Sequence, residues 1–225
     1  MKSCIASAVA AFVQTSKSKK LGAWHKRLYN FKFVATMIAS ELLLQGYRLG
    51  VFPMAMEDNA IEWFSPDPRA IMPLQEFHVS HALQRILRKG VFQIKIDNRF
   101  AEVIRACARR EDTWINPEIV ESYERLHELG YAHSVETWSK GKLAGGLYGV
   151  AIGGAFFGES MFHRERDASK IALVALVERL RAKKFALLDT QWLTPHLQQF
   201  GAIEISREHY LRLLGRAVEL PRKFL

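Results

Sequence analysis

The chain has 225 residues, 49% of them apolar, so it has enough apolar surface for a full core and is not a mostly disordered protein. Its two cysteines, Cys4 and Cys107, exclude a disulfide framework and fit a reducing compartment. Residues 1–40 contain seven Lys or Arg residues and no acid, so the rest of the chain is almost balanced, and the net charge of +9 does not by itself indicate a folded body that binds nucleic acid.

Residues 1–28 form an acid-free basic segment without a clear periodic pattern. Three interpretations fit it: a secretory signal, a Ser-rich organelle transit peptide, and a disordered basic extension. We expect the basic extension, and with it a cytoplasmic protein; a transit peptide would instead direct the chain to an organelle. No run of about 18 uncharged apolar residues occurs, so we expect no membrane-spanning helix.

Apolar spacing and capping residues predict helices over residues 30–49, 80–89, 100–109, 117–129 and 168–182. The helix over residues 168–182 is expected to be amphipathic. Alternation and turn residues predict strands over residues 91–96, 132–138, 142–150, 151–158, 185–190 and 202–205. The proline-rich residues 51–75 are expected to be ordered but irregular. An α+β fold follows, with an N-terminal segment over residues 29–75 and a core over residues 76–225.

Two apolar strands of this core end in polar side chains. The stretch GGAFFGESMF carries Glu159 and Ser160, and the stretch LLDTQW carries Asp189 and Gln191. Polar groups at strand ends are where α+β proteins place chemistry. Asp189 and Gln191 are two residues apart, so both side chains point to one face, where the carboxylate could hold the amide. Spacing alone favours side chains that only satisfy loop backbone groups.

These stretches, with DASK between them and LTPHL after them, resemble the leucyl/phenylalanyl-tRNA–protein transferases. Further family-like motifs occur upstream in order: GVFP, WFSPDPR, TWI, YERLHELG and AHSVE. The resemblance extends from about Leu42 to Leu214. It implies a small N-terminal α/β domain, then a GNAT-like acyltransferase core with a mixed sheet and flanking helices, and an enzyme without a cofactor.

The resemblance also implies a reaction. Such enzymes transfer Leu or Phe, with Met as a further candidate, from aminoacyl-tRNA to the N-terminal Arg or Lys of proteins, which marks those proteins for N-degron degradation. The implied partners are aminoacyl-tRNA and proteins that begin with Arg or Lys, and we expect a monomer. Asp189 and Gln191 are implied as the catalytic pair, with the Gln191 amide oxygen accepting a hydrogen bond from the incoming amine.

Binding residues are implied as well. Glu159 and Ser160 would bind the N-terminus of the acceptor, because a carboxylate gives a cationic side chain a charge-assisted bond. The alternative for Glu159 is an ion pair with Arg164 or Arg166. The pocket for the carried amino acid would be lined by Met161, Leu173, Leu176, Leu180 and Leu188. From pattern alone, these five residues are ordinary core between a helix and a sheet.

The tRNA is assigned two candidate contacts. Arg85, Arg88 and Lys89 fall within one turn of the helix over residues 80–89 and would contact the phosphate backbone of the acceptor stem. A solvated helix face is the alternative interpretation. Trp63 and Trp114 are candidates to stack on the terminal adenine, and burial in the core is the alternative for each.

The sequence departs from the family pattern in three places. The usual N-terminal segment with a GGDL-type motif is absent, Met54 stands where a Trp commonly follows the FP pair, and Thr190 stands where a Cys commonly separates Asp and Gln. Strand alternation predicts that Thr190 points away from the face of Asp189 and Gln191. The missing segment would affect the entrance for adenosine and peptide.

Two other functions are alternatives to this one. An acyl-CoA N-acetyltransferase on the same core needs a glycine-rich pyrophosphate loop at the head of its main helix, and no glycine occurs between Gly158 and Gly201. A non-catalytic tRNA-binding protein would not account for Glu159, Asp189 and Gln191 together. His and Cys residues lack acidic or cysteine partners at metal-binding spacing, so we expect no metal site.

Overall fold

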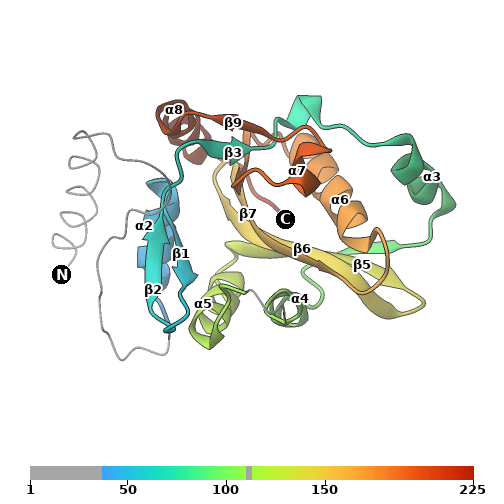
Figure 1. Ribbon diagram of the computed structural model, residues 1–225, viewed down its shortest axis with the longest axis horizontal. Helices are drawn as coiled ribbons and strands as arrows, with labels where there is room; N and C mark the ends of the chain where they lie inside the picture. The colour runs from blue at the N-terminus through green and yellow to red at the C-terminus, as the bar shows by residue number, and fades with distance from the viewer. Residues whose placement is uncertain (1–36, 110–112) are drawn as a thin grey trace.

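The computed structural model describes residues 37–109 and 113–225. The expected basic extension over residues 1–28 and the first part of the helix predicted from residue 30 lie outside the described residues. The N-terminal part that is described contains α2 (Ser40–Arg48) and an antiparallel hairpin of β1 (Phe52–Ala55) and β2 (Ile61–Phe64) (Figure 1).

The prediction that residues 51–75 are irregular is wrong, since they also contain β3 (Arg69–Ile71) and a short 3₁₀ helix, η1 (Leu74–Glu76). The prolines did not prevent strand formation for a physical reason. Pro53 lies in β1, whose only neighbour among the described strands is β2, so a missing backbone donor can face away from the ladder.

Seven strands form the large sheet among the described residues, in the order β4-β5-β6-β7-β8-β3-β9. Their bounds are β4 (Gln93–Ile96), β5 (Ala132–Ser139), β6 (Lys142–Ile152), β7 (Ala155–His163), β8 (Leu187–Gln191) and β9 (Ile203–Ile205). Neighbours pair antiparallel except β7 and β8, which are parallel and joined by α6 (Ala168–Ala182). This is the mixed sheet with flanking helices that the family resemblance implies. Because β3 lies inside it, the N-terminal segment and the core share one sheet.

Helices cover both faces of the large sheet (Figure 1). One face packs against α6, and the other against α4 (Phe100–Cys107) and α5 (Pro117–Glu128). Each face has its own cluster of buried apolar side chains. The remaining helices are α3 (His81–Lys89), the short α7 (Pro195–Gln198) and α8 (Arg207–Val218), of which the sequence pattern did not predict the last two.

Capping residues and apolar spacing in the sequence predicted the positions of α3 and α6 correctly. Ser80 accepts a hydrogen bond from the Leu83 backbone at 3.3 Å, and Gly90 ends α3 in the left-handed conformation. The bounds of α6 agree with the prediction, but its expected amphipathic character is wrong. It is buried on most sides, because η1 and the C-terminal Phe224 pack against it as well as the sheet.

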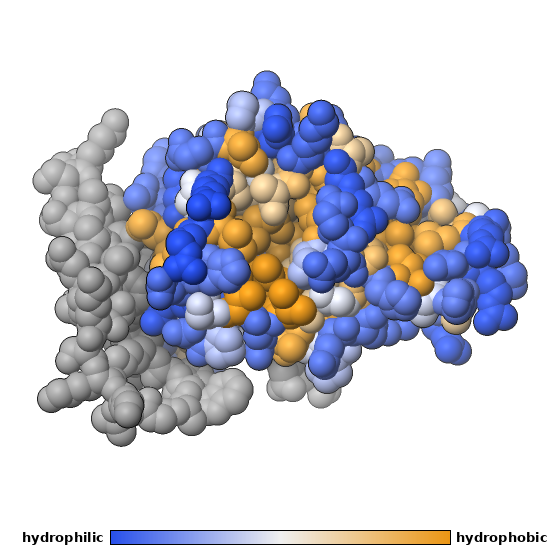
Figure 2. All heavy atoms as spheres, turned by 90° about the horizontal axis from the view of Figure 1, so that it is seen from above, coloured by the Kyte–Doolittle hydropathy of each residue, from blue (hydrophilic) through white to orange (hydrophobic). Residues whose placement is uncertain are grey.

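The surface separates into apolar and hydrophilic regions. On the face seen in Figure 2, apolar side chains gather towards the middle, and the end of the molecule that carries α3 is hydrophilic. No helix in the described part of the chain is long and apolar enough to cross a membrane.

Candidate active site

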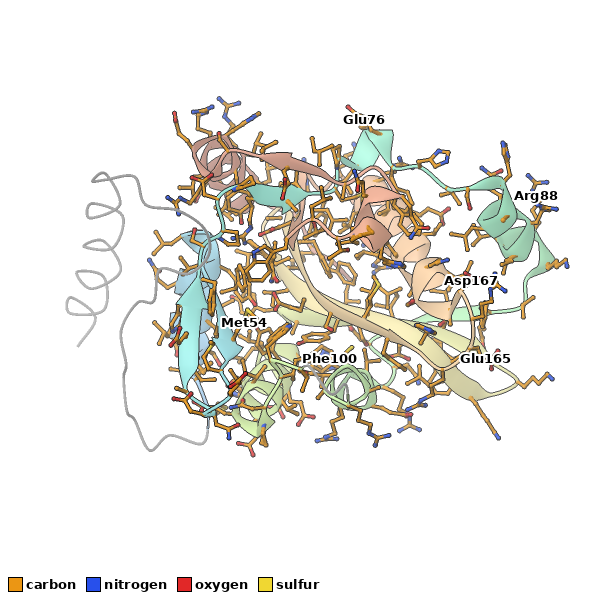
Figure 3. All side chains as sticks on the ribbon, in the orientation of Figure 1. Met54, Glu76, Arg88, Phe100, Glu165 and Asp167 are labelled. Carbon is orange, nitrogen blue, oxygen red and sulfur yellow. The ribbon has the colours of Figure 1, made fainter. Side chains whose placement is uncertain are left out.

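The large sheet opens between its two parallel strands. β7 and β8 pair only at Ala155 with Leu187, Phe156 with Leu188, and Phe157 with Asp189. Beyond these pairs the strands separate, and a pocket of about 980 Å³ lies where they part. Its wall runs from Met54 on β1 to Asp167 at the start of α6 (Figure 3).

A β-bulge sets the direction of the side chains on β7. Gly149 pairs with Gly158 and Tyr148 pairs with Ser160, so Glu159 is an extra residue on its strand. Phe157 and Phe162 consequently pack into the same core cluster although they are five positions apart, an odd offset that would place them on opposite faces of a regular strand. Bulges of this kind re-aim side chains next to functional sites. Here the bulge turns Glu159 towards α2 and α5, while Met161 packs towards α6.

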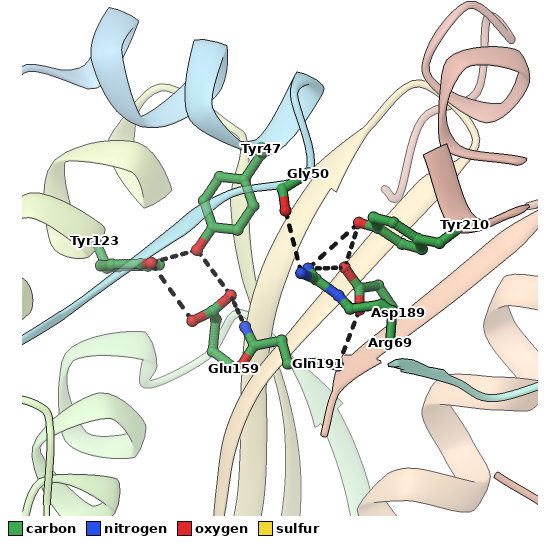
Figure 4. A network of polar contacts seen from close by, with 8 residues as sticks. All are labelled: Tyr47, Gly50, Arg69, Tyr123, Glu159, Asp189, Gln191 and Tyr210. Atoms are coloured by element: carbon green, nitrogen blue, oxygen red, sulfur yellow. Dashed lines mark hydrogen bonds and ion pairs between the residues drawn. The ribbon is translucent and has the colours of Figure 1, made fainter. Parts of the chain in front are cut away.

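The Glu159 carboxylate lies at the centre of a buried hydrogen-bond network (Figure 4). Tyr47 donates to Oε1 at 2.7 Å, the Gln191 amide donates to Oε1 at 3.0 Å, and Tyr123 donates to Oε2 at 3.4 Å. The hydroxyls of Tyr47 and Tyr123 also contact each other. Burial, followed by the charge of Glu159, raises the pKa of both tyrosines well above its usual value, so both remain protonated donors.

Burial also raises the pKa of Glu159 to about 7. The Asp189 carboxylate contributes to this net rise, whereas the hydrogen bonds from Tyr47 and Gln191 and the charge of Arg69 oppose it. A carboxyl group that titrates near neutral pH and lines a pocket is a candidate for proton exchange or for binding a cation. The ion pair of Glu159 with Arg164 or Arg166 is not formed, because Arg164 binds Glu102 and Arg166 lies by Asp167.

Asp189 is held by a different set of partners. The guanidinium of Arg69 binds it with two hydrogen bonds, from Nε to Oδ1 at 2.9 Å and from Nη2 to Oδ2 at 2.6 Å. Tyr210 donates to Oδ2 at 2.6 Å, and the Gln191 backbone donates to Oδ1 at 2.9 Å. Arg69 is 1% exposed and Asp189 is fully buried. Burial alone would lower the pKa of Arg69, but Asp189 raises it, so the guanidinium stays charged.

Gln191 connects the two networks. Its φ of 66° is left-handed, which is uncommon for a residue other than glycine and often marks a functional site. Its backbone donates to Asp189, and its side-chain amide donates to Glu159. The expectation that the Asp189 carboxylate holds the Gln191 amide is therefore wrong: Asp189 fixes the Gln191 backbone. No donor among the described residues bonds the Gln191 amide oxygen, which leaves it open to a ligand in the pocket.

Most of the predicted site residues line this one pocket. It includes Glu159, Ser160, Met161, Leu173, Leu176, Leu188, Gln191 and Trp114. Asp189 and Leu180 lie behind its wall, both fully buried. Thr190 also lines the pocket, which Asp189 does not.

The two tryptophans are placed differently. Trp114 lines the pocket together with Met54, whereas Trp63 does not line it and packs against Gly46 on α2. The basic residues of α3 lie elsewhere: Arg85, Arg88 and Lys89 are exposed, and Arg88 points away from the core at the end of the molecule (Figure 3). Sequence reasoning gave no site role to Tyr47, Arg69, Tyr123 and Tyr210, although Arg69 and Tyr123 lie in quoted motifs.

Comparisons with known proteins agree with the resemblance. The family model "Leucyl/phenylalanyl-tRNA protein transferase" matches residues 71–215, and the model of that family's N-terminal domain matches residues 37–67. The family's N-terminal domain is therefore present from residue 37, which corrects the expectation that this segment is missing, although the chain carries no GGDL-type motif. A structure of L-PGS from Bacillus licheniformis is 13% identical, with a TM-score of 0.38, over 70% of this chain and 55% of that one.

Curated relatives are much more similar. The leucyl/phenylalanyl-tRNA–protein transferase of Herpetosiphon aurantiacus is 54% identical over 188 residues, which cover 83% of this chain and 98% of that protein. The protein of the same name from Akkermansia muciniphila is 54% identical over 187 residues, which cover 81% of this chain and 97% of that protein. With both family models matched in order and relatives this similar along nearly their whole length, the chain belongs to the leucyl/phenylalanyl-tRNA–protein transferase family.

Proposed function

We propose that this enzyme transfers Leu or Phe, with Met as a further candidate, from aminoacyl-tRNA to the N-terminal Arg or Lys of acceptor proteins, which marks them for N-degron degradation. The leucyl/phenylalanyl transferase activity follows from the family. The observation that carries the finer proposal is the pocket between β7 and β8. It combines an apolar wall with a carboxyl group that titrates near neutral pH and with the Gln191 amide oxygen, which no described donor binds.

The reaction is aminolysis of an ester. The neutral α-amine of the acceptor attacks the ester carbonyl, a carbon–nitrogen bond forms, the bond to the ribose oxygen breaks, and the amine proton ends on that oxygen. The ester is already activated, so the enzyme must mainly position the amine and the developing charge. The Gln191 amide oxygen accepts the hydrogen bond from the amine, and Asp189 acts as a positioning residue through the Gln191 backbone.

Replacing Gln191 with Ala is expected to lower kcat for transfer by about 10²-fold, the usual scale for losing one positioned polar group. Binding of aminoacyl-tRNA should change little, because the amide makes its contact with the amine. Single-turnover transfer and equilibrium tRNA binding measure the two effects separately. Wild-type turnover in this variant would remove Gln191 from the mechanism, and Gln93→Ala, an exposed amide on the edge strand β4, is the matched control.

The apolar wall explains the choice of amino acid. Met161, Leu173, Leu176 and Leu188 line the pocket on the side of α6. A flexible Met among leucines adapts to Leu, Phe or Met, and excludes the β-branched Val and Ile by shape. Leu180 is buried behind this wall in the same cluster and supports it.

Acceptor choice rests on Glu159 with Ser160. The buried carboxyl is close to half protonated at neutral pH when no acceptor side chain is bound. An Arg or Lys side chain arriving beside it favours the charged form and lowers its pKa, so the bound pair is ionised. A guanidinium matches the carboxylate through two bonds, and an ammonium matches it as a point charge.

The basic face of α3 is assigned to the tRNA backbone. Replacing Arg85, Arg88 and Lys89 together with Ala is expected to weaken binding of all suitable aminoacyl-tRNAs and to reduce the slope of log K against log salt by roughly 0.7–0.9 per lost phosphate contact. Binding titrations at several salt concentrations measure this slope. A triple Ala variant of the exposed Lys183, Arg212 and Arg216 is the control. An unchanged slope in the α3 variant would show that α3 does not contact the backbone.

One assay tests the proposed function as a whole. Labelled Leu is offered on tRNA to a peptide that begins with Arg, and labelled acetyl-CoA is offered to the same peptide. Transfer from tRNA and none from acetyl-CoA is expected, whereas the reverse would favour the acetyltransferase alternative. Cytoplasmic location and a monomeric state remain predictions.

A further inference from the structure

The mouth of the pocket is basic, in contrast to its apolar wall. Five basic residues line the pocket: His163, Arg164, Arg166, Lys170 and His196. Its lining contains two acids, Glu159 in the buried network and Asp167 at the start of α6. We refer to His163, Arg166, Lys170 and His196 as the basic rim, since Arg164 is already paired with Glu102 at 3.0 Å.

The charges of the basic rim exceed those of its counterion. Asp167 binds Lys170 at 2.9 Å and lies 3.5 Å from Arg166, whose side chain is 96% exposed. A single carboxylate thus faces two cations. Burial, and then the nearby Lys170 and His163, lower the pKa of His196, which indicates that these three side chains lie close together. The rim therefore presents surplus positive charge at the mouth.

Two buried polar atoms of the pocket also lack partners. Among the described residues, Nε2 of His196 and Oγ1 of Thr190 have no hydrogen-bond partner, and both residues line the pocket. The amide nitrogen of Gln199 lies 3.2 Å from Nδ1 of His196. Because that amide nitrogen can only donate, Nδ1 accepts and Nε2 carries the proton. An unpaired buried donor is costly, so the site is suited to a ligand that accepts hydrogen bonds.

The rim lies farther out than the reacting groups. His163 is four residues beyond Glu159 on β7, which corresponds to about 13 Å at the usual strand rise. If the ester lies at Gln191 and Glu159, the nucleotides on the 5′ side of the terminal adenosine leave the pocket through its mouth, next to the basic rim. Their phosphodiester groups are negative, and their free oxygens only accept hydrogen bonds, which matches the rim.

We propose that the basic rim binds the phosphodiester groups of the last nucleotides at the 3′ end of the donor tRNA, with Thr190 adding a hydrogen bond from the floor. This contact is separate from the contact of α3 with the acceptor stem, and it rests on the proposed function. It positions the donor ester relative to Gln191, because it fixes the strand immediately next to the reacting adenosine.

The test compares donors with and without a phosphate. The phenylalanyl ester of adenosine has none, and the phenylalanyl ester of the dinucleotide CpA has one phosphodiester. The readout is the ratio of kcat/KM for the CpA donor to that for the adenosine donor, with a peptide that begins with Arg. Lys170→Ala and His196→Ala should each lower this ratio about tenfold, the scale of a lost charge-assisted hydrogen bond. Lys183→Ala, at the other end of α6, should leave the ratio unchanged.

Direct binding completes the test. The trinucleotide CpCpA and adenosine are titrated onto the full chain at equilibrium; the rim variants should weaken only the trinucleotide, and Thr190→Val should do so more mildly. An unchanged ratio together with unchanged CpCpA binding would overturn the proposal. So would a raised KM for acceptor peptides with an acidic second residue and no effect on the donor, which would assign the rim to acceptors. If the wild-type enzyme transfers from no donor, tRNA included, the proposed function fails while the titration still decides the rim.

Discussion

Replacing Asp189 with Ala is expected to destabilise the folded protein by about 3–5 kcal/mol, because the change leaves Arg69 buried without its counterion. Arg69 is 1% exposed and gives Asp189 two hydrogen bonds, at 2.9 and 2.6 Å. Tyr210 loses its acceptor at the same time. Urea unfolding measures the effect as a lower transition midpoint with an unchanged slope. We expect transfer to fall as well, since the Gln191 backbone loses the bond that holds it.

A double variant separates the two roles of Asp189. Combining Arg69→Met with Asp189→Leu removes both charges, and replacing a buried ion pair by apolar residues is often neutral for stability. The double variant should recover much of the stability and still transfer slowly, because the Gln191 backbone remains unsupported. Unchanged unfolding in Asp189→Ala with a loss of turnover would contradict the positioning role and favour direct participation in catalysis. Asp58→Ala is the control, because Asp58 is exposed and its removal leaves no buried charge without a partner.

The sequence predicted most of the pocket because its clues are local. Polar residues at the ends of two apolar strands pointed to Glu159 and Gln191, which needs only the direction of each strand. Apolar spacing marked Leu173 and Leu176 as core, and the family resemblance implied their place in the pocket. The caps of α3 at Ser80 and Gly90 are local signals of the same kind.

The errors came from contacts and irregularities without a local pattern. The partner of Asp189 lies 120 residues away, in a segment whose prolines suggested an irregular structure. Tyr47 looked like one more apolar position of a helix, yet its hydroxyl reaches Glu159. Period-two alternation does not reveal the bulge at Glu159, and it fails at Gln191, where the left-handed backbone ends β8 and turns the amide towards Glu159.

Replacing Glu159 with Gln is expected to raise KM for peptides that begin with Arg roughly 30- to 1000-fold. This corresponds to a loss of about 2–4 kcal/mol of binding free energy, because the bound cation loses its buried counterion. The side chain keeps its size and can still contact Tyr47 and Gln191. Binding of aminoacyl-tRNA should change little. Peptides that begin with citrulline, a neutral analogue of Arg, should be poor acceptors for both proteins, and Glu204→Gln, exposed on β9, is the matched control.

The same substitution should also change how stability and acceptor preference depend on pH. Burial raises the pKa of Glu159 from 4.5 to about 7, so the folded protein retains the proton more strongly than the unfolded chain. Its contribution to stability is therefore complete below about pH 4.5 and is lost as pH rises through about 7. Glu159→Gln should remove this decline in unfolding titrations. It should also remove the part of the preference for Arg over citrulline that grows as pH rises towards 7, since only the ionised carboxylate binds the cation. If the variant keeps the wild-type preference at every pH, the N-terminal cation is bound elsewhere, and Glu159 serves to hold Gln191.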